Sequence, residues 1–465
     1  MDTVKTQALV IGAGPGGYPC AIRLGQLKVP TIVVEKYKPG GVCLNVGCIP
    51  SKALINAAKL FDKMRHGADM GLLVDNARVD MGRLVDWKDD VVGKLTGGVK
   101  QLLKANGAEY RQGEVRLVSK NEVEVRDPKG ASYHIQARSI VIATGSRPIE
   151  IPGFKVDEKR ILSSTGALAL REVPGRLVVI GGGYIGLELG MMYAKLGSKV
   201  AVIEMTPTLL PGTDPELVQV VARKMKKLGM ETHLEARAKS DDGKAVTIES
   251  KDGASLKLDA DSVLVTVGRR PNSDGLGLAE VGVAIDAKGF VKVDQRMRTN
   301  VEGIYAIGDV AGQPMLAHKA TKEGEVAAEV IAGRASAMDV RAIPAVIFTD
   351  PEIATCGLSD AEARASGREV AIGKFPMVAL GRALALAEPD GFVKIVLDKA
   401  SKEVLGVHVV GSSASDVISE AALALEMGAM AEDIGLTIHP HPTIPEAIME
   451  ASKAALGEAI HIVNR

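Results

Sequence analysis

Two glycine-rich turns, each lying between an apolar strand and a helix, restrict this chain more than any other feature. The first is Gly12-x-Gly14-x-x-Gly17, which follows the apolar residues 8–11 and precedes a second apolar run at 31–35. In such a turn the first glycine makes the tight bend, the second lets the backbone approach a pyrophosphate, and the third lets the helix pack against the strand. The phosphates then lie at a helix N-terminus, where backbone amides favour negative charge. This pattern predicts a βαβ unit that binds a dinucleotide.

The same pattern recurs later in the chain, over residues 176–204. In both copies the second strand ends in an acid, Glu35 or Glu204, which could accept hydrogen bonds from ribose hydroxyls. One such motif alone is a weak signal, but two copies in the same context are hard to explain as ordinary glycine turns. The chain is therefore expected to hold two dinucleotides. The glycines of the second turn are Gly181, Gly183 and Gly186.

The second unit also indicates which nicotinamide cofactor it takes. A carboxylate at Glu204 would repel the 2′-phosphate of NADP, and residues 205–208 supply no arginine to bind that phosphate. The sequence therefore favours NAD.

The remaining segments predict an α/β chain with two Rossmann-like domains and a C-terminal α+β domain. Helical patterns cover residues 51–65 and 91–105, a β-rich stretch follows at 113–142, and strands mix with helices from about residue 345. Prolines and glycines at 148–153 and the segment 269–272 suggest boundaries. The expected divisions are 1–148 for the first dinucleotide domain, 149–271 for the second, 272–344 for a central part completing the first site, and 345–465 for the C-terminal domain.

Composition excludes several classes of protein. Lys and Arg together number 57, as do Asp and Glu, so no basic excess exists to bind nucleic acid. No uninterrupted apolar run of about 18 residues predicts a membrane span, and the first residues do not resemble a secretory signal, so a cytoplasmic protein is expected. Four cysteines are too few for a disulfide scaffold, and neither they nor the histidines form the paired spacing of a metal site. Cys20 and Cys356 look like ordinary buried cysteines.

The other two cysteines lie in a distinctive segment at residues 40–52. Cys43 and Cys48 are five residues apart, which on an ideal helix places them on different faces, so coupling their sulfurs needs a distortion that Gly47 and Pro50 could permit. A thiol near a helix N-terminus and a lysine such as Lys52 is expected to have a lowered pKa, as a nucleophile requires. The alternative is that the two thiols are unrelated and buried.

A second unusual segment lies near the C-terminus. Only eight histidines occur in the chain, and two of them, His439 and His441, lie here between prolines, with Glu446 five residues beyond the second. An imidazole held rigidly and oriented by an acid is what a general base needs. Most histidines in proteins are structural or merely exposed, so this motif alone leaves the role open.

Taken together, these residues resemble the flavin-dependent pyridine nucleotide-disulfide oxidoreductases over essentially the whole chain, and within that family the dihydrolipoamide dehydrogenase branch. The segment from Cys43 to Lys52 is the most specific part of the likeness. The resemblance implies FAD in the first dinucleotide domain and NAD in the second. It assigns Gly12, Gly14, Gly17, Glu35, Lys52, Thr144, Gly145, Asp309 and Ala317 to FAD, and Gly181, Gly183, Gly186, Glu204 and Gly268 to NAD.

The resemblance also implies catalytic roles. Cys43 would be the thiol that exchanges with the substrate, and Cys48 the one that meets the flavin. Lys52 would lie beside the flavin ring, paired with Glu188. His441 would then act as the base.

In this family the base is oriented by an acid, here Glu446, and the pair serves the active site of the other subunit, so the resemblance implies a homodimer. The implied activity is NAD-linked oxidation of dihydrolipoyl groups to lipoyl groups. These groups would be carried in trans, on lipoyl domains of 2-oxoacid dehydrogenase complexes or on the H protein of glycine cleavage. The opposing interpretation is a flavin-binding assembly protein with idle cysteines, which would need none of the reactive residues together.

Near relatives differ at definite positions. An NADPH-linked glutathione reductase is expected to have arginines where Met205 and Thr206 stand, and mercuric reductases carry a further cysteine pair after Cys356 that this chain lacks. Two departures from the branch remain. Tyr184 stands where an aliphatic residue is common, and Pro440 stands where a small residue is usual.

Overall fold

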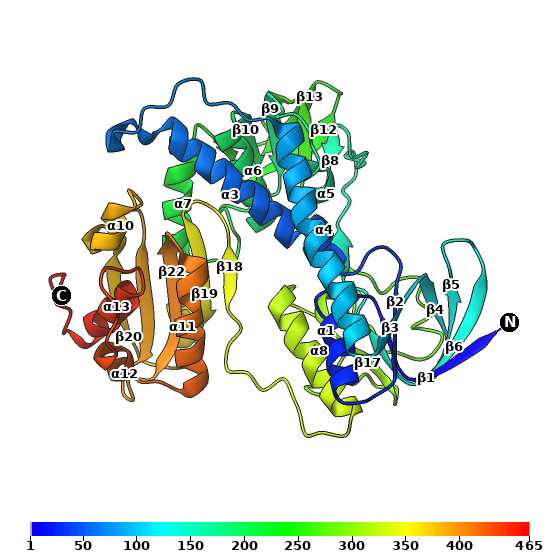
Figure 1. Ribbon diagram of the computed structural model, residues 1–465. Coiled ribbons are helices and arrows are strands. Elements are labelled where there is room, and N and C mark those ends of the chain that lie inside the picture. The colour runs from blue at the N-terminus through cyan, green and yellow to red at the C-terminus, as the bar shows by residue number, and fades with distance from the viewer. Residues whose placement is uncertain (1, 465) are drawn as a thin grey trace. The chain divides into compact units, whose positions relative to one another are not determined.

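The structure is a computed structural model that describes residues 2–464 (Figure 1). The chain forms two compact units, each made from segments that are distant in the sequence. The first unit contains the residues up to Ala57, Val74–Glu172 and Val267–Asp339. The second contains Ala58–Leu73, Val173–Thr266 and the residues from Val340 onward.

The first unit is built on a seven-stranded sheet with the order β3-β2-β1-β6-β5-β4, to which β17 adds by pairing with β6. The strands β3, β2, β1, β6 and β17 run parallel, whereas β4 and β5 pair in antiparallel fashion. The bounds are β1 (Thr3–Ile11), β2 (Thr31–Glu35), β3 (Ala108–Gln112), β4 (Glu114–Ser119), β5 (Glu122–Arg126), β6 (Ser132–Ile142) and β17 (Ile304–Ala306).

The second half of the central strand β1, from Ala8 to Ile11, is buried on both faces, as expected of a parallel sheet covered on both sides. Ala8 and Val10 pack into the core beneath the helices α1 (Gly17–Gln26) and α8 (Ala317–Ile331). Leu9 and Ile11 point into the core on the opposite face. Figure 1 shows α1 and α8 side by side in this unit. The glycine turn after β1 therefore lies directly after the buried end of this strand.

The long helix α4 (Met81–Ala105) begins ten residues before the expected start at 91. Its first turn is fixed by Asp80, whose carboxylate accepts a hydrogen bond from the Arg83 amide at 3.0 Å. The short helix α2 (Gly41–Val46) and the helix α3 (Cys48–Arg65) follow β2, and the latter agrees with the helix expected at 51–65.

In the second unit, the other glycine turn follows β9, an inner strand that pairs in parallel with β10 and β15 in the order β11-β10-β9-β15. An antiparallel sheet of β12, β13 and β14 follows. The bounds are β9 (Arg176–Ile180), α6 (Tyr184–Leu196), β10 (Lys199–Ile203), α7 (Pro215–Lys227), β11 (Glu231–His233), β12 (Ala236–Asp241), β13 (Ala245–Ser250), β14 (Ser255–Asp259) and β15 (Ser262–Val265).

The C-terminal part of the second unit is an antiparallel sheet, β18-β19-β22-β21-β20, packed against α11 and α13. Its central strand β22 is buried along its whole length. The bounds are β18 (Ala345–Ile347), β19 (Glu352–Gly357), β20 (Val370–Pro376), β21 (Phe392–Asp398), β22 (Val404–Gly411), α11 (Ala414–Met427), α12 (Ala431–Leu436) and α13 (Glu446–Leu456).

The remaining elements are short. They are β7 (Ser146–Pro148), β8 (Ile161–Leu162), α5 (Ser164–Ala167), β16 (Arg269–Pro271), α9 (Asp360–Ala365), α10 (Gly381–Ala385) and the 3₁₀ turns η1 (Gly67–Met70), η2 (Gly308–Val310) and η3 (Met377–Ala379). Among residues 2–464, no helix has the length and apolar content needed to cross a bilayer. The fold class is confirmed, whereas the division into four domains stays a prediction.

Candidate active site

In the first glycine turn, the protein itself requires two of the three glycines. Gly12 has φ +103°, and a Cβ there would lie 2.3 Å from the carbonyl oxygen of Ala143. A Cβ on Gly17 would lie 1.9 Å from the carbonyl oxygen of Gly12. A Cβ on Gly14 would meet only Gly41 Cα, at an ordinary 3.8 Å. The packing of the protein does not require a glycine at position 14. The missing side chain therefore leaves room for a ligand, and a pyrophosphate needs this close approach to the backbone.

The second turn repeats this division. Gly181 has φ +106°, and a Cβ on Gly186 would lie 2.3 Å from the Gly181 carbonyl oxygen and 2.6 Å from Thr266 Oγ1. A Cβ on Gly183, the N-cap of α6, would meet nothing within 4 Å. Both turns therefore fit the phosphates of a dinucleotide at a helix N-terminus.

The acid at the end of each second strand is held in the same way in both units. Glu35 accepts the Ala13 amide on one oxygen and the Tyr37 amide on the other, both at 2.8 Å. These bonds fix the carboxylate beside the glycine turn while leaving lone pairs free for ribose hydroxyls.

Glu204 is held by the equivalent bonds, from the Gly182 amide at 2.7 Å and the Thr206 amide at 2.8 Å. Thr206 thus holds the Glu204 carboxylate through its backbone amide. This arrangement supports the preference for NAD that the sequence suggested.

The segment Thr144-Gly145 is hydrogen bonded to the residue that directly follows β16. Thr144 Oγ1 donates to the carbonyl oxygen of Asn272 at 2.7 Å. Ser146, which sequence reasoning missed, donates to the carboxylate of Asp309 at 2.5 Å, and Arg269 Nε donates to Ser146 Oγ at 2.8 Å. The Asp309 carboxylate is therefore oriented through a serine whose only sequence signal is its place directly after Gly145.

The first turns of α8, which starts at Ala317, hold both the glycine turn and the Asp309 turn. Thr321 Oγ1 donates to the Pro15 carbonyl oxygen at 2.9 Å. The carboxylate of Glu323 accepts the Gly308 amide at 2.7 Å and pairs with Lys319 at 2.7 Å, with both side chains buried. Burial raises the pKa of Glu323, although Lys319 and the Gly308 amide oppose that rise.

The two cysteines of the 40–52 segment are brought together by a break between two helices. Cys43 lies in α2, Gly47 takes φ −138° and ψ −111°, and Cys48 is the first residue of α3. The distortion predicted at Gly47 is thus present, and the side chains of Cys43 and Cys48 hydrogen bond to each other. Both are free thiols, with Cys43 half-buried and Cys48 exposed. The interpretation as two unrelated buried thiols is wrong.

The expected lowering of the thiol pKa is also wrong for Cys43 in this dithiol form. The hydrogen bond to Cys48 and burial both raise the pKa of Cys43, and the nearby charge of Lys52 only partly opposes them. A second thiol at hydrogen-bond distance favours the protonated form because two adjacent thiolates repel each other.

Lys52 and Glu188 belong to different compact units, and their pairing stays a prediction. Lys52 lies one turn after Cys48 on α3. Glu188 is buried in α6, where its carboxylate accepts the Phe348 amide at 2.8 Å.

The histidine and acid near the C-terminus form a pair. His441 Nδ1 lies 2.9 Å from Glu446 Oε1, and the other carboxylate oxygen accepts the Thr443 amide at 2.7 Å. Partial burial would raise the pKa of Glu446, but these two hydrogen bonds hold it below its usual value. The imidazole is 78% exposed, so its Nε2 can meet a molecule from outside this chain. Such a pair can accept a proton at Nε2 while the carboxylate stabilises the charge.

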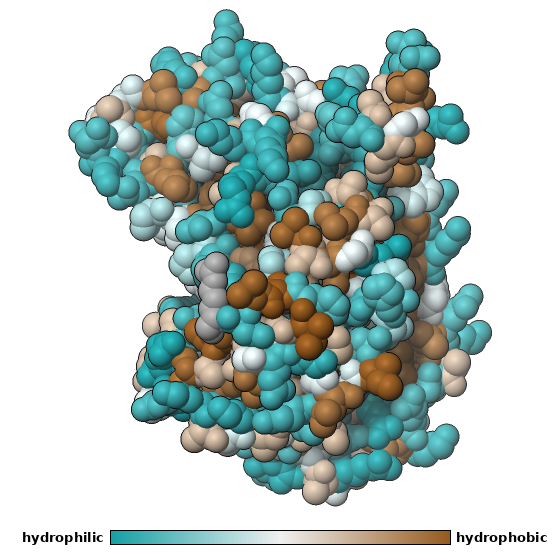
Figure 2. Space-filling view, turned by 90° about the vertical axis from the view of Figure 1, so that its left-hand side faces the viewer, coloured by the Kyte–Doolittle hydropathy of each residue, from teal (hydrophilic) through white to brown (hydrophobic). Residues whose placement is uncertain are grey.

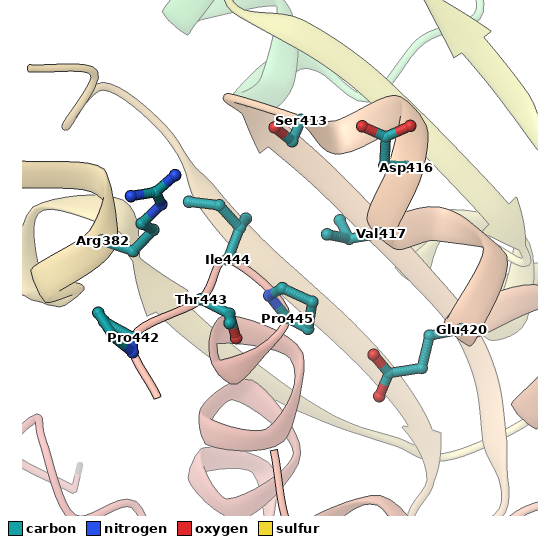
Figure 3. A pocket seen from close by; sticks show the side chains of 9 residues that line it. All are labelled: Arg382, Ser413, Asp416, Val417, Glu420, Pro442, Thr443, Ile444 and Pro445. Atoms are coloured by element: carbon teal, nitrogen blue, oxygen red, sulfur yellow. The ribbon is translucent and has the colours of Figure 1, made fainter. Parts of the chain in front are cut away.

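A cavity of about 390 Å³ lies beside this pair, between α10, α11 and the segment leading into α13 (Figure 3). Figure 3 shows Val417 and Glu420 on α11 across from Thr443 and Pro445. The lining residues are Arg382, Ser413, Asp416, Val417, Glu420, Pro442, Thr443, Ile444 and Pro445.

Large apolar side chains are exposed close to the same elements. On and after α11 they include Leu423, Met427, Leu436 and Ile438, the last of them 94% exposed. Figure 2 shows that apolar patches interrupt the polar surface on the face it draws. Apolar side chains that gather on a surface are typical of protein interfaces.

Comparison with known families now defines the class of protein. Residues 6–324 match the pyridine nucleotide-disulphide oxidoreductase family, and residues 343–452 match the dimerisation domain of the same family. The chain belongs to this family of oxidoreductases.

Individual relatives show which members of the family this chain is similar to. The chain is 51% identical to a dihydrolipoyl dehydrogenase of Bacillus subtilis, over 99% of this chain and 98% of the relative. It is 49% identical to that of Geobacillus stearothermophilus, with the same coverage. Among solved structures, LpdA from Mycobacterium tuberculosis matches with a TM-score of 0.89 and 26% identity, over 96% of this chain and 99% of that one. The disulfide reductase RclA of Escherichia coli matches with a TM-score of 0.86 and 25% identity, over 97% and 99%.

Proposed function

We propose that this protein is an FAD-dependent dihydrolipoyl dehydrogenase that oxidises protein-bound dihydrolipoyl groups to lipoyl groups and reduces NAD⁺. The contact between Cys43 and Cys48 across the helix break carries this proposal, because a dithiol-disulfide pair is what exchange with a dithiol substrate requires. About half of the residues are identical to those of dihydrolipoyl dehydrogenases along the full chain.

The disulfide exchange uses residues of the chain in sequence. With Cys43 and Cys48 joined as a disulfide, His441 takes the proton of one dihydrolipoyl thiol at Nε2, and the resulting thiolate attacks the Cys43 sulfur. The Cys43–Cys48 bond breaks and Cys48 leaves as a thiolate. The second substrate thiol gives its proton to the Cys48 thiolate and attacks the substrate sulfur of the mixed disulfide, so that Cys43 leaves as a thiolate and takes the proton held by His441. The lipoyl disulfide closes, and the two electrons remain on the pair, which becomes the dithiol form.

FAD, when bound, carries these two electrons onward to NAD⁺, and the chain supplies the binding sites. We propose that Gly12, Gly14, Gly17 and Glu35 hold FAD, with Thr144, Gly145, Asp309 and Ala317 completing its site and Lys52 lying beside its ring. Gly181, Gly183, Gly186, Glu204 and Gly268 would hold NAD. The middle glycines, Gly14 and Gly183, are left open by the packing and support this assignment.

The proposed enzyme is a homodimer in which the His441–Glu446 pair serves the cysteines of the second copy. The match to a dimerisation domain and the exposed apolar side chains near α11 support this arrangement. The proposed partners are lipoyl domains of 2-oxoacid dehydrogenase complexes or the glycine-cleavage H protein. The uncoupled buried thiols of Cys20 and Cys356 suit the cytoplasm, where such thiols stay reduced.

The test is NADH formation by the purified yellow protein supplied with dihydrolipoamide, with NAD⁺ and NADP⁺ compared in parallel. We expect rapid turnover with NAD⁺ and little with NADP⁺. No oxidation of dihydrolipoamide, combined with NADH-driven reduction of another disulfide, would keep the family and overturn the substrate.

A further inference from the structure

His439, which precedes the proposed base by two residues, forms a second histidine-carboxylate pair that the disulfide exchange does not use. Its Nε2 lies 2.7 Å from Glu420 Oε1 on α11, and its Nδ1 lies 2.9 Å from the carbonyl oxygen of Thr437. The His439 side chain is only 4% exposed, in contrast to the open imidazole of His441.

The partners of His439 exclude it from acting as a base. A carbonyl oxygen can only accept a hydrogen bond, and an ionised carboxylate can also only accept. Both ring nitrogens of His439 are therefore engaged by oxygen atoms of this chain, and neither is open to a substrate thiol. Among residues 2–464, His441 by comparison hydrogen bonds through Nδ1 alone, to Glu446.

The segment between the two pairs is held by further hydrogen bonds. Thr443 Oγ1 donates to the Pro440 carbonyl oxygen at 2.7 Å, and the Thr443 amide donates to Glu446 at 2.7 Å. Residues 437–443 are thus fixed upstream through His439 to α11 and downstream through Thr443 to α13. Pro440, whose ring fixes φ, lies between these two anchors. Pro440 therefore helps to keep the backbone between the two anchors in one conformation.

We infer that His439 and Glu420 are positioning residues, which fix the segment that carries the base so that His441 Nε2 is presented in one place. This inference rests on the proposed function. A proton transfer demands close and aligned atoms, and a displacement of about 1 Å can cost on the order of 100-fold in rate. The pair would therefore act on the dithiol reaction and not on the exchange between NADH and the flavin.

The experiment uses Glu420→Ala and Glu420→Gln in the FAD-loaded, full-length enzyme. Two activities are measured on the same samples, dihydrolipoamide oxidation with NAD⁺ and NADH-driven reduction of ferricyanide, which needs no base at the dithiol. Glu426→Ala serves as a matched control because it removes the same charge from the same helix.

For Glu420→Ala we expect a loss of at least about 10-fold in kcat for dihydrolipoamide, with the ferricyanide activity within about twofold of wild type. Glu420→Gln keeps an acceptor for Nε2 and is expected to recover most of the lost activity. Unchanged dihydrolipoamide oxidation in Glu420→Ala, or an equal fall in both activities together with loss of FAD absorbance, would overturn the positioning role. If wild type itself fails to oxidise dihydrolipoamide but reduces ferricyanide, the proposed function fails first.

Discussion

At the scale of single residues, the glycines of each nucleotide turn separate into two kinds. A side chain at Gly186 would strike backbone and Thr266, whereas a side chain at Gly183 would meet nothing of the protein. The first kind is required by the fold, and the second leaves space for a ligand. This distinction can be tested without changing any charge.

We expect Gly183→Ala to fold normally and to raise the KM for NAD⁺ by about 10-fold or more, because the added methyl group occupies the place of the pyrophosphate. Gly186→Ala, in contrast, should lower stability or prevent folding. Gly98→Ala, in the open on α4, is the control: it should leave the KM for NAD⁺ unchanged and should not lower stability, because alanine favours a helix more than glycine does. Thermal unfolding and NAD⁺ kinetics measure the two effects, and a wild-type KM in Gly183→Ala would contradict this account.

The sequence predicts the residues that belong to short local motifs. It does not predict the residues whose contacts form only between distant segments of the folded chain. The paired Glu35 and Glu204 follow directly from strand and turn patterns. Ser146 and Arg269, which orient Asp309, lie more than 100 residues apart and meet only in the folded unit. The pKa of Cys43 differs from the sequence-based prediction because its largest cause, the hydrogen bond to Cys48, depends on the helix break.

At the scale of elements, a buried lysine joins the C-terminal sheet to the starts of α7 and α9. Lys394 on β21 contacts Asp214 and Glu216 at the start of α7 and Asp360 at the start of α9, and its side chain is 3% exposed. Burial would lower the pKa of Lys394, but its three carboxylate partners more than offset this and raise it. A buried charge with several partners costs most when its partners lose it.

Replacing Lys394 with methionine is expected to destabilise the protein by about 3–5 kcal/mol, because the carboxylates around it lose their counter-charge. Lys374→Met is the matched control. Lys374 pairs with the same Glu216 at 2.8 Å but is largely exposed, so its loss should cost less than about 1 kcal/mol. Denaturant unfolding compares the two, and equal losses would contradict the role of burial.

A histidine on the neighbouring strand makes stability depend on pH. His408 on β22 is buried, with Nε2 at 2.9 Å from the Leu358 carbonyl oxygen and no partner for Nδ1 among the described residues. Burial, helped by Lys394, lowers the pKa of His408 below its ordinary value, although the bond to Leu358 opposes this. The unfolded chain therefore binds the extra proton more readily than the folded protein does.

The free energy of unfolding should consequently be level above the unfolded-state pKa of about 6.5 and fall as the pH drops below it. His408→Gln should flatten this fall, because the proton-binding group is absent in both states. Unfolding measured at a series of pH values between about 7 and 5 tests the prediction. If the free energy of unfolding fell equally with pH in wild type and variant, His408 would contribute nothing to the pH dependence of stability.

At the scale of the whole molecule, the two nucleotide turns, the cysteine pair and the histidine pair occur on different parts of one chain, and the proposed reaction needs all of them. The two turns show the same packing and the same carboxylate contacts, although they belong to different compact units. The central claim is that electrons enter through the Cys43–Cys48 pair.

The most direct test of that claim is dihydrolipoamide turnover by Cys48→Ser, with FAD content measured on the same sample. Serine cannot form the disulfide, yet it keeps the size of the side chain, so the fold and the flavin should be retained. The account predicts FAD bound at the wild-type level and dihydrolipoamide oxidation lost almost completely. Wild-type turnover in this variant, with FAD still bound, would contradict the disulfide mechanism.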